Sequence, residues 1–347
     1  MTETRTKDDL RMLQALPLEI KIPMTKRRIV EWVNEYGING VYVSFSGGKD
    51  STVLLHMVRE LFPEVEAVFV NTGLEYPEIQ QFVKTFDNVT ILRPKMRFDE
   101  VIKNYGYPII SKNVSRVIYD ARKGKAWAMR YVNGTAYMQN GEKSYLCCEK
   151  YAPLLSVDFK CANTCCDVMK KAPMKQYGKQ TGKKPITAQM AAESKRREMQ
   201  WLQKGCNAFD TANPMSNPMS FWTEQDVLQY IKKYNIPIAS VYGDIVYQTE
   251  PEQMRLEDLG VKNCGTEPLC TTGCDRTGCI FCAFGAHLEK ESRFERLKQT
   301  HQRQYAYCIG GGEYDENGIW KPNKQGLGMG HVFDELNKIY GDGFIKY

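Results

Sequence analysis

Residues 41–55 constrain the fold of this chain more than any other stretch of its sequence. Residues 41–45 alternate β-branched and aromatic side chains, which is typical of a buried strand, and residues 52–60 carry a helical pattern of apolar side chains. Gly47 and Gly48 lie between the two patterns and permit a tight turn. A strand, a glycine turn and a helix in this order present backbone N–H groups and a helix N-terminus to an anion. The sequence therefore predicts a phosphate-binding turn.

The same turn carries polar side chains that suit phosphate. Ser46, Ser51 and Thr52 supply hydroxyl donors, and Lys49 supplies a positive charge. The stretch is not a Walker loop, because the four-residue spacer before Gly-Lys is absent. The alternative interpretation is a glycine turn that only joins a strand to a helix. The strand and helix patterns on either side favour phosphate binding over that alternative.

Residues 46–51, Ser-Gly-Gly-Lys-Asp-Ser, resemble the pyrophosphate-binding loop (PP-loop) of the adenine nucleotide α-hydrolase-like enzymes. This superfamily includes ATP pyrophosphatases, ATP sulfurylase small subunits and phosphoadenosine phosphosulfate (PAPS) reductases. Residues 71–78 are similar to its Asp-Thr-Gly-x-Glu-x-Pro-Glu signature, which lies beside the nucleotide, although Asn71 replaces the aspartate. Residues 218–231 closely resemble its Pro-Leu-x-x-Trp-Thr-x-x-Asp-Val-x-x-Tyr-Ile segment, where Thr223 is predicted to cap a helix that carries Asp226 in its first turn.

A further segment, residues 186–197, resembles the family pattern Ile-Thr-Gly-x-Arg-x-x-Glu-Ser-x-x-Arg only in part. Glu193, Ser194 and Arg197 match, whereas Ala188 and Met190 replace the glycine and the first arginine. In the family this arginine-bearing segment meets the anionic groups of the nucleotide. The replacement predicts altered substrate recognition, with Lys195 or Arg196 compensating for the missing arginine.

The resemblance implies catalytic roles for Lys49, Asp50 and Ser51. It also implies a nucleotide-binding set drawn from the matching segments. The members of this set are Ser44, Ser46, Gly47, Gly48, Lys49, Asp50, Ser51, Thr52, Asn71, Thr72, Gly73, Glu75, Glu193 and Arg197.

Short strands that alternate with helices predict a doubly wound α/β fold with a mostly parallel sheet. The expected elements are helices at residues 25–36, 78–86, 98–105, 112–122 and 284–296, strands at 65–70 and 89–92, and a loop or hairpin at 123–144. The predicted division is an N-terminal lead-in at 1–24, a PP-loop nucleotide-binding domain at 25–245, and a cysteine-rich, cluster-binding region at 246–347.

Twelve cysteines are too many for core filling in a chain that we expect to be cytoplasmic, where structural disulfides are rare. Two pairs, Cys147-Cys148 and Cys165-Cys166, precede a dense group at Cys264, Cys270, Cys274, Cys279 and Cys282. The C-x-x-C at 279–282 places two thiolates on one side of a turn, which suits one metal centre. Zinc and an iron–sulfur cluster both fit an all-thiolate set, and the spacing alone does not separate them.

Residues 165–174 resemble the Cys-Cys-x-x-x-Lys-x-x-Pro-Leu segment of sulfonucleotide reductases, which pairs with a distant C-x-x-C to hold a [4Fe-4S] cluster. Residues 147–154 match that pattern less well. Residues 274–282 also resemble the clustered cysteines of DNA phosphorothioation pyrophosphatases. The resemblance thus implies a [4Fe-4S] cluster, with zinc as the alternative, and five candidate ligands for four places: Cys165, Cys166, Cys274, Cys279 and Cys282. Cys161, Cys206 and Cys308 are expected to be buried or free thiols.

The charge and the apolar pattern bear on location and partners. No apolar run is long enough to span a bilayer and the polar N-terminus lacks a signal-peptide pattern, so we expect a cytoplasmic protein without membrane contact. A net charge of +6 is unevenly spread, with basic clusters at residues 170–171, 183–184, 195–197 and 321–324. This charge is compatible with anionic ligands or nucleic acid, and equally with a solvated lysine-rich surface.

Three functions remain open from the sequence. The first is an ATP pyrophosphatase that uses Mg²⁺, adenylates an acceptor such as nucleic acid, and lets sulfur from a donor such as a cysteine desulfurase replace the adenylate. The intact loop resembles the ATP-cleaving members and favours it. The second is a PAPS or adenosine phosphosulfate (APS) reductase that works with thioredoxin. The tail lacks the Glu-Cys-Gly-(Ile/Leu)-His motif that supplies the attacking cysteine in such reductases, so Cys308 would have to substitute. The third is a non-catalytic nucleotide or nucleic-acid sensing module.

Overall fold

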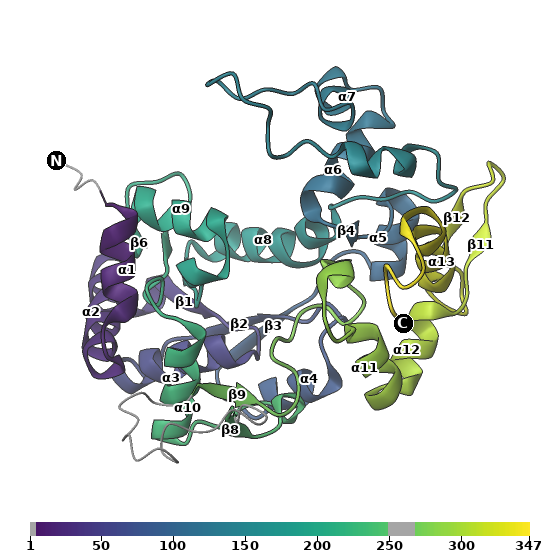
Figure 1. Cartoon of the computed structure of the whole chain (residues 1–347). Helices are drawn as coiled ribbons and strands as arrows, with labels where there is room; N and C mark the ends of the chain where they lie inside the picture. The colour runs from purple at the N-terminus through teal and green to yellow at the C-terminus, as the bar shows by residue number, and fades with distance from the viewer. Residues whose placement is uncertain (1–4, 249–267) are drawn as a thin grey trace, which may run out of the picture. The chain divides into compact units, whose positions relative to one another are not determined.

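The computed structural model describes residues 5–248 and 268–347. The chain forms two compact units, each built from several chain segments (Figure 1). Unit 1 contains residues 1–71, 75–92 and 174–277, and unit 2 contains residues 72–74, 93–173 and 278–347. The predicted boundaries at 24/25 and 245/246 therefore fall inside unit 1. Residues 93–173 join the C-terminal residues instead, because strand β4 (Ile109–Ile110) pairs in parallel with β10 (Ala283–Phe284).

A six-stranded sheet forms the centre of unit 1. Its strands, in the order β3-β2-β1-β5-β7-β6, are Val89–Leu92, Ala67–Val70, Val41–Ser44, Lys184–Ile186, Met215–Ser216 and Asn207–Ala208. Neighbouring strands are parallel except β6 and β7, so the predicted α/β class with a mostly parallel sheet is confirmed. From β1 the chain builds β2 and β3 on one side and later β5 on the other. Open sheets of this kind bind ligands at the carboxyl ends of the strands where the order reverses.

Helices cover both faces of this sheet. The α-helices of unit 1 are α1 (Lys7–Ala15), α2 (Leu18–Tyr36), α3 (Lys49–Leu61), α4 (Pro77–Val83), α9 (Lys195–Lys204), α10 (Glu224–Tyr234) and most of α8 (Ala172–Thr181). Figure 1 shows α8 and α3 on opposite sides of the strands. Tyr177 of α8 packs against Tyr42 of β1 and Val68 of β2. Alternate residues of β1 therefore pack into the apolar layers on the two faces of the sheet, as expected for a sheet that is buried on both faces.

The helix before β1 is longer than the sequence pattern predicted. It begins at Leu18 rather than at residue 25 and includes Pro23. A proline inside a helix removes one backbone hydrogen bond. Burial of Leu18 and Ile22 in the added turns compensates for that loss.

A buried ion pair fixes α2 to α10. The Lys21 ammonium lies 2.7 Å from the Asp226 carboxylate, and both side chains are almost fully buried. Next to this pair, the Trp222 indole N–H donates to the Thr25 hydroxyl at 2.8 Å. The Thr223 side chain caps α10 and Asp226 bonds back to the Thr223 backbone, so the predicted cap is confirmed.

Unit 2 is mainly helical, with short strands. Its α-helices are α5 (Phe98–Tyr105), α6 (Lys112–Ala121), α7 (Ala126–Val132), α11 (Arg293–Thr300), α12 (Gln302–Ile309) and α13 (Met329–Tyr340). The hairpin strands β11 (Glu313–Tyr314) and β12 (Trp320–Lys321) are antiparallel, and a π-helical turn (Asp167–Lys171) precedes α8.

Two predictions for unit 2 differ from the structure. The predicted loop or hairpin at 123–144 begins with α7, since Ala128 and Val132 bury one face of a helix there, while an antiparallel bridge between Tyr137 and Lys143 forms a hairpin in its second half. The predicted helix at 284–296 is instead a strand end, a 3₁₀ turn (Ala286–Leu288) and the first residues of α11. Gly285 with φ +79° and the Ser292 cap of α11 break the continuous helix. Within the described residues, no helix is both long and apolar enough to cross a membrane.

Candidate nucleotide site

The predicted phosphate turn lies between β1 and α3 in unit 1. The strand ends at Ser44, and α3 begins at Lys49. Gly47 has φ +72°, a conformation that favours glycine, and a Cβ there would lie 2.7 Å from a Val83 methyl and 2.8 Å from an Ile79 methyl. A side chain at position 47 would therefore collide with α4 while straining the backbone. The turn requires glycine for both reasons.

Hydroxyl groups hold the turn in shape. The Ser46 and Ser51 Oγ atoms lie 3.0 Å apart, and the Ser46 backbone N–H donates to Ser51 Oγ at 3.2 Å. Ser51 and Thr52 hydroxyls both donate to the Gly48 carbonyl, at 2.9 and 3.0 Å. The predicted residues 46, 48, 51 and 52 thus form one hydrogen-bonded loop at the N-terminus of α3.

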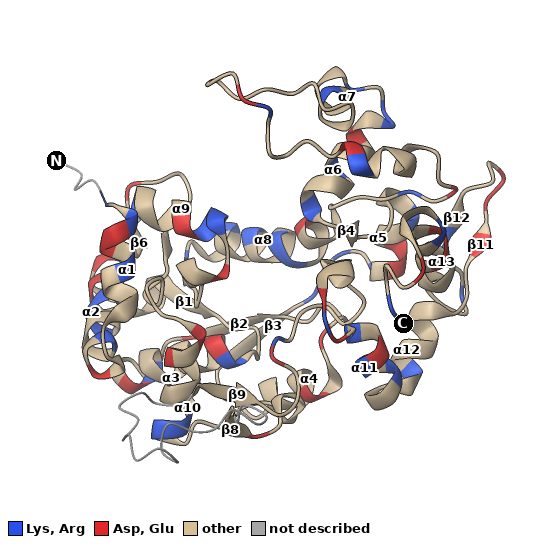
Figure 2. Cartoon of the chain, in the orientation of Figure 1, with Lys and Arg blue, Asp and Glu red and all other residues tan. Residues whose placement is uncertain are grey.

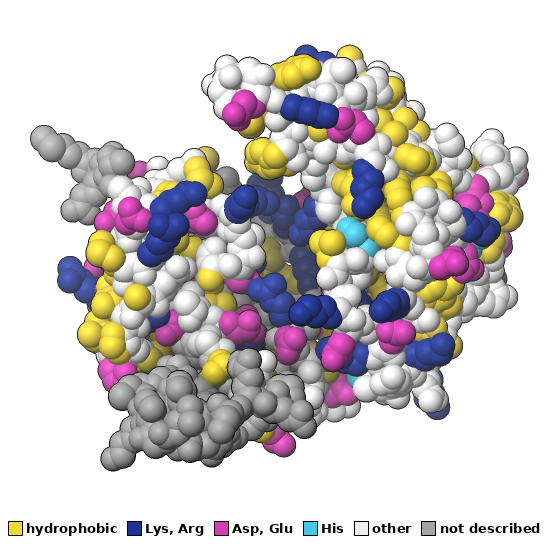
Figure 3. Space-filling model, viewed as in Figure 1, with side chains coloured by type: hydrophobic (Ala, Val, Ile, Leu, Met, Phe, Trp, Pro, Cys, Tyr) yellow, Lys and Arg dark blue, Asp and Glu magenta, His cyan; other side chains and the backbone are white. Residues whose placement is uncertain are grey.

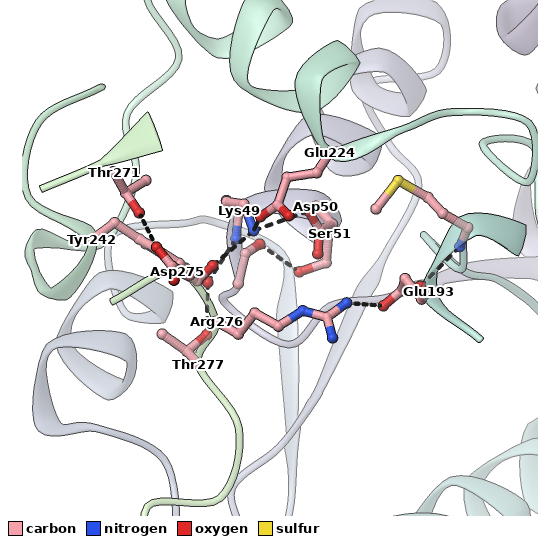
Figure 4. A network of polar contacts seen from close by, with 12 residues as sticks. Lys49, Asp50, Ser51, Glu193, Glu224, Tyr242, Thr271, Asp275, Arg276 and Thr277 are labelled. Atoms are coloured by element: carbon pink, nitrogen blue, oxygen red, sulfur yellow. Dashed lines mark hydrogen bonds and ion pairs between the residues drawn. The ribbon is translucent and has the colours of Figure 1, made fainter. Parts of the chain in front are cut away.

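Lys49 is the centre of a network of polar contacts that Figure 4 shows from close by. Its backbone N–H donates to the Tyr242 hydroxyl at 3.1 Å, and its Nζ donates to the Asp275 carbonyl at 3.0 Å. The same Nζ lies 3.0 Å from a Glu224 carboxylate oxygen. Burial opposes the charge of Lys49, but Asp50 and Glu224 outweigh it and raise its pKa. Lys49 is therefore a buried, charged ammonium group at the loop.

Asp50 is the buried carboxylate of the site. One of its oxygens, Oδ1, has no hydrogen-bond partner in the described part of the chain, and the Lys49 Nζ lies 3.7 Å from it. Burial raises the pKa of Asp50, although the positive charges of Lys49 and Arg276 act in the opposite direction. A buried carboxylate oxygen without a hydrogen bond is the kind of ligand that Mg²⁺ binds.

Glu193 gathers the second group of charges in the site. Its Oε2 accepts from the Met190 backbone N–H at 3.0 Å and pairs with Arg197. Its Oε1 lies 3.3 Å from the Arg276 guanidinium (Figure 4). The Met190 side chain itself is buried. Arg276 thus stands beside Glu193, while Lys195 and Arg196, predicted to compensate at this position, are exposed residues at the start of α9.

The remaining predicted nucleotide-binding residues divide between the units. Asn71 and Glu75 belong to unit 1 with the phosphate loop, whereas Thr72 and Gly73 belong to unit 2. The Thr72 hydroxyl accepts from the Leu74 backbone N–H at 3.1 Å, which shapes that turn locally. The structure therefore brings the loop residues and the pair Glu193 and Arg197 into one unit.

The sequence did not predict five residues of this site, which are Glu224, Tyr242, Asp275, Arg276 and Thr277. Tyr242 also shares a hydrogen bond of 2.6 Å with the Thr277 hydroxyl, and both hydroxyls lie where a Cβ on Gly48 would point. Only tertiary structure brings residues from α10, the turn after it and the cysteine-rich segment to the loop. The sequence offered one indication of Arg276, since it is a cation among small and polar residues. We interpreted this stretch as a metal site instead, because of Cys274 and Cys279.

Four of the five candidate cysteine ligands share unit 2. Cys165 and Cys166 precede the π-helical turn, and the Cys282 backbone N–H donates to the Cys279 carbonyl at 3.0 Å, which closes the C-x-x-C turn. The hydrogen bond with Cys166, burial and the charges of Cys282 and Cys279 raise the pKa of Cys165.

The neighbouring Cys166 thiol has the opposite shift. The hydrogen bond from Cys165 lowers the pKa of Cys166, and the Lys112 and Lys170 ammonium groups lower it further. Thiolates are the donors that an iron–sulfur cluster or zinc takes from cysteine, and a lowered pKa favours the thiolate of Cys166.

Cys274 belongs to unit 1, where its backbone N–H donates to the Val241 carbonyl at 2.9 Å and its carbonyl accepts from the Thr271 hydroxyl at 3.1 Å. Cys264 lies outside the described residues. Among the residues that the structure describes, no three His, Cys, Asp or Glu side chains form a group that could hold a metal ion. The cysteine centre stays a prediction.

The other cysteines differ in exposure. Cys148, Cys161 and Cys308 are buried, whereas Cys147 and Cys206 are half-buried. Cys308 is fully buried, and its Sγ lies 3.5 Å from the Met329 Sδ. Burial raises the pKa of Cys308, so its thiol is a poor nucleophile.

Acidic residues lie beside two of the basic clusters. Figure 2 colours Lys and Arg positions along α8 and α9 and Asp and Glu positions in the segments near them, and both charges appear on the face that Figure 3 shows. Lys171 pairs with Asp167 at 2.6 Å, and Lys183 pairs with Glu66 at 2.5 Å. Partial neutralisation of this kind is typical of a solvated protein surface, which was the alternative interpretation of these clusters.

Comparison with known proteins gives matches in sequence and in structure. A family model described as the phosphoadenosine phosphosulfate reductase domain matches residues 40–110 and 138–284. An uncharacterized protein of Methanocaldococcus jannaschii is 37% identical over 78 residues, which are 21% of this chain. The chain spans 18% of the length of that curated relative.

Three solved structures resemble the chain at low sequence identity. They are a PAPS reductase from Candida auris in complex with phosphate (15% identical, 76% of this chain and 97% of that one, TM-score 0.36), an FMN adenylyltransferase from Candida glabrata (10%, 67% and 64%, 0.36), and an NH3-dependent NAD synthetase from Campylobacter jejuni (13%, 64% and 75%, 0.32). These TM-scores are too low to support a function. The family model, which matches more than half of the 347 residues and includes the phosphate loop, shows that the chain belongs to the phosphoadenosine phosphosulfate reductase domain family.

Proposed function

We propose that this protein is a nucleotide-using enzyme that cleaves ATP to AMP and pyrophosphate and transfers the adenylyl group to an acceptor. The observation that carries the proposal is the phosphate loop, in which Lys49, Asp50 and Ser51 begin α3 around a turn that only glycine fits. The raised pKa of Lys49 keeps its ammonium group charged beside this turn. A charged ammonium and a helix N-terminus together suit a polyphosphate.

Each loop residue has a role in this reaction. The loop N–H groups with the Ser46 and Ser51 hydroxyls would hold the β,γ-pyrophosphate, and Lys49 would offset its charge. Asp50 would position Mg²⁺ through its Oδ1, which lacks a hydrogen bond. Because attack on the α-phosphorus is in line with the leaving pyrophosphate, catalysis consists mainly of positioning and charge stabilisation.

The structure of the C-terminal region favours this reaction over reduction of PAPS or APS. A sulfonucleotide reductase needs an accessible thiolate that attacks sulfur. Cys308, the thiol assigned to that role under the alternative, is fully buried against Met329, and burial raises its pKa. The alternative therefore lacks a nucleophile at the position that the sequence offered for it.

The cysteines of unit 2 support a role in sulfur transfer. Cys165, Cys166, Cys279 and Cys282 would hold a [4Fe-4S] cluster, or zinc as the alternative, because they share one unit and their charges act on one another. Such a centre would bind or relay sulfur. Cys274, which belongs to unit 1, is left out of the proposed set.

The proposed partners follow from the reaction. The acceptor would be a nucleic acid, and the sulfur would come from a donor such as a cysteine desulfurase. A thioredoxin is the partner under the reductase alternative. A sensing module would bind the nucleotide without turnover.

Pyrophosphate and sulfite distinguish these functions. Protein purified without oxygen would be incubated with ATP, Mg²⁺ and oligonucleotides, and separately with PAPS plus thioredoxin. We expect pyrophosphate from the first mixture and no sulfite from the second. Lys49→Ala should abolish pyrophosphate release, because it removes the buried charge of the loop. Lys84→Ala is the matched control, since Lys84 is an exposed lysine at the end of α4.

The contrary results are equally specific. Sulfite without pyrophosphate would replace the proposal with the reductase. Tight ATP binding without either product would replace it with the sensing module. Pyrophosphate release that survives Lys49→Ala would show that the phosphate loop is not the site of cleavage.

A further inference from the structure

The peptide that leads from β9 (Leu269–Thr271) toward the C-x-x-C is anchored to the phosphate loop. Two contacts fix its backbone, since the Asp275 carbonyl accepts from Lys49 Nζ at 3.0 Å and the Thr277 hydroxyl bonds to the Tyr242 hydroxyl at 2.6 Å. Tyr242 in turn accepts from the Lys49 backbone N–H. Arg276 lies between these two anchored residues, so its Cα is held at the loop.

The side chain of Arg276 remains accessible although its backbone is fixed. It is 64% exposed, and its guanidinium reaches Glu193, which is itself largely buried. Figure 4 shows the Arg276 side chain extending from Asp275 toward Glu193, past Asp50 and Ser51. A long cationic side chain on a fixed backbone can change partner without a change of fold.

The charges around Arg276 are arranged in two groups. Lys49 lies with Asp50 and Glu224 at the start of α3, whereas Arg276 lies with Glu193 at the carboxyl-end side of β5. Glu193 carries a second guanidinium, that of Arg197. One carboxylate shared by two guanidinium groups gives this second group a net positive charge, whereas Lys49 with Asp50 and Glu224 is net negative. The guanidinium groups therefore suit an anion beside the one that the loop itself binds.

We propose that Arg276 contacts the α-phosphate of the nucleotide and is a catalytic residue of the adenylyl transfer. The proposal rests on the proposed function and adds a residue to it. The acceptor oxygen forms a bond to the α-phosphorus, and the bond from that phosphorus to the bridging oxygen breaks. Pyrophosphate leaves with the electron pair, and the proton of the acceptor hydroxyl passes to water. Arg276 stabilises the negative charge on the α-phosphate oxygens during this step, while Lys49 serves the leaving pyrophosphate.

Ligand binding tests this assignment without requiring turnover. The dissociation constants of ATP, AMP and inorganic pyrophosphate, each with Mg²⁺, would be measured by calorimetry for the full chain and for Arg276→Ala, Lys49→Ala and Arg27→Ala. Arg27 is the matched control, because it is an exposed arginine on helix α2 that also pairs with a glutamate, Glu31. Arg276→Lys, which keeps the charge but loses the planar fork, and a thermal unfolding curve guard against a folding defect.

Arg276→Ala should weaken ATP and AMP about tenfold or more and leave pyrophosphate within about twofold, the loss expected for one charged hydrogen bond. Lys49→Ala should weaken ATP and pyrophosphate more than AMP. Arg276→Lys should recover part of the lost affinity, and Arg27→Ala should change none of the three.

Two results overturn the assignment. In one, Arg276→Ala leaves the affinity for ATP unchanged. In the other, it weakens pyrophosphate as much as Lys49→Ala does, which would place Arg276 at the pyrophosphate. The variants could instead change the affinities for ATP, AMP and pyrophosphate as expected while the full chain releases no pyrophosphate. That result would contradict the proposed function but would support the contact between Arg276 and the α-phosphate.

Discussion

The phosphate loop and the cysteine set of unit 2 are built in opposite ways. The loop is one short stretch whose geometry is fixed by a glycine, a strand end and a helix start. The cysteines come from two places more than a hundred residues apart, and the pairing of β4 with β10 joins those two regions of the chain. The loop therefore depends on local backbone conformation, whereas the cysteine set depends on tertiary packing.

This difference predicts different kinds of sensitivity. A local site is damaged mainly by changes within its own few residues. A site assembled from distant segments is damaged by the loss of any one ligand, because each segment supplies only half of the set. Four predictions test the comparison, from the largest expected effect to the smallest.

Gly47→Ala should have the largest effect. The substitution forces a non-glycine residue to φ +72° and places its Cβ within 2.8 Å of two α4 side chains. Strain of about 1–2 kcal/mol together with this overlap should reduce ATP affinity about 100-fold or more. The measurement is equilibrium ATP binding. Gly182→Ala is the control, since Gly182 has φ +73° with nothing within 4 Å. Equal losses in both variants would mean that strain alone matters.

Cys279→Ser and Cys282→Ser should each remove most of the bound metal, whereas Cys274→Ser should retain it. The proposed set takes all its ligands from unit 2, and Cys274 belongs to unit 1. Metal analysis and the visible spectrum of protein purified without oxygen measure the outcome. Loss of metal in Cys274→Ser would contradict the division of the five candidates and would make the cysteine set draw on both units.

Lys21→Met should destabilise the fold by about 3–5 kcal/mol, because it leaves the buried Asp226 carboxylate without its partner. Urea unfolding measures the change. Lys26→Met is the control. Lys26 lies on the same helix as Lys21 but pairs with the more exposed Glu60 of α3, so its loss should lower the free energy of unfolding by only about 0–1 kcal/mol. Where both variants are folded, ATP binding should match that of the unchanged chain. A selective loss of ATP binding in Lys21→Met would show that the loop depends on distant packing after all.

His56 should give the smallest effect, through pH. Burial lowers the pKa of His56 in α3 below its usual 6.5, and its Nδ1 lies 2.9 Å from the Tyr230 hydroxyl. The unfolded chain therefore takes up this proton first as the pH falls. Stability from this group is complete above pH 6.5 and is lost as the pH falls through the lower pKa of the folded state.

The measurement is the melting temperature between pH 7.5 and 5.5 (about the range in which His titrates). His56→Gln should flatten the dependence. His287 in unit 2 also has its pKa lowered by burial, so His287→Gln is the parallel variant for that unit. If neither variant changes the pH dependence of the melting temperature, that dependence comes from other titratable groups.

The sequence predicted the local parts of this molecule and missed the parts that tertiary structure assembles. The strand, turn and helix around Gly47 follow from residue type and spacing, as does the Thr223 cap. Tyr242 and Glu224 gave no local signal, because each meets Lys49 only after nearly two hundred intervening residues have folded. Cys274 stays a predicted candidate, because its spacing suits a metal ligand while its backbone belongs to unit 1.

Burial also reversed two expectations about single elements. The helix predicted from residue 25 begins at Leu18 instead, because the buried Leu18 and Ile22 extend it through Pro23. The charged residues after Phe284 suggested a helix with a basic face. Arg293 instead contacts the Cys282 carbonyl at 2.9 Å and pairs with Glu289, at a point where the chain has already turned. Neither the burial of Leu18 and Ile22 nor the contact of Arg293 with the Cys282 carbonyl follows from the neighbouring residue types alone.

The interleaving of the two units limits how genes of this kind can recombine. The chain enters unit 2 in three separate stretches, so no single cut yields unit 2 as one continuous polypeptide. A chimaera that takes its C-terminal part from a relative would need its junction at residues 277–278, where only two residues separate Arg276 from Cys279. An insertion or deletion there would change the spacing between Arg276 and Cys279. We therefore expect the length of this peptide to be inherited together with these two residues.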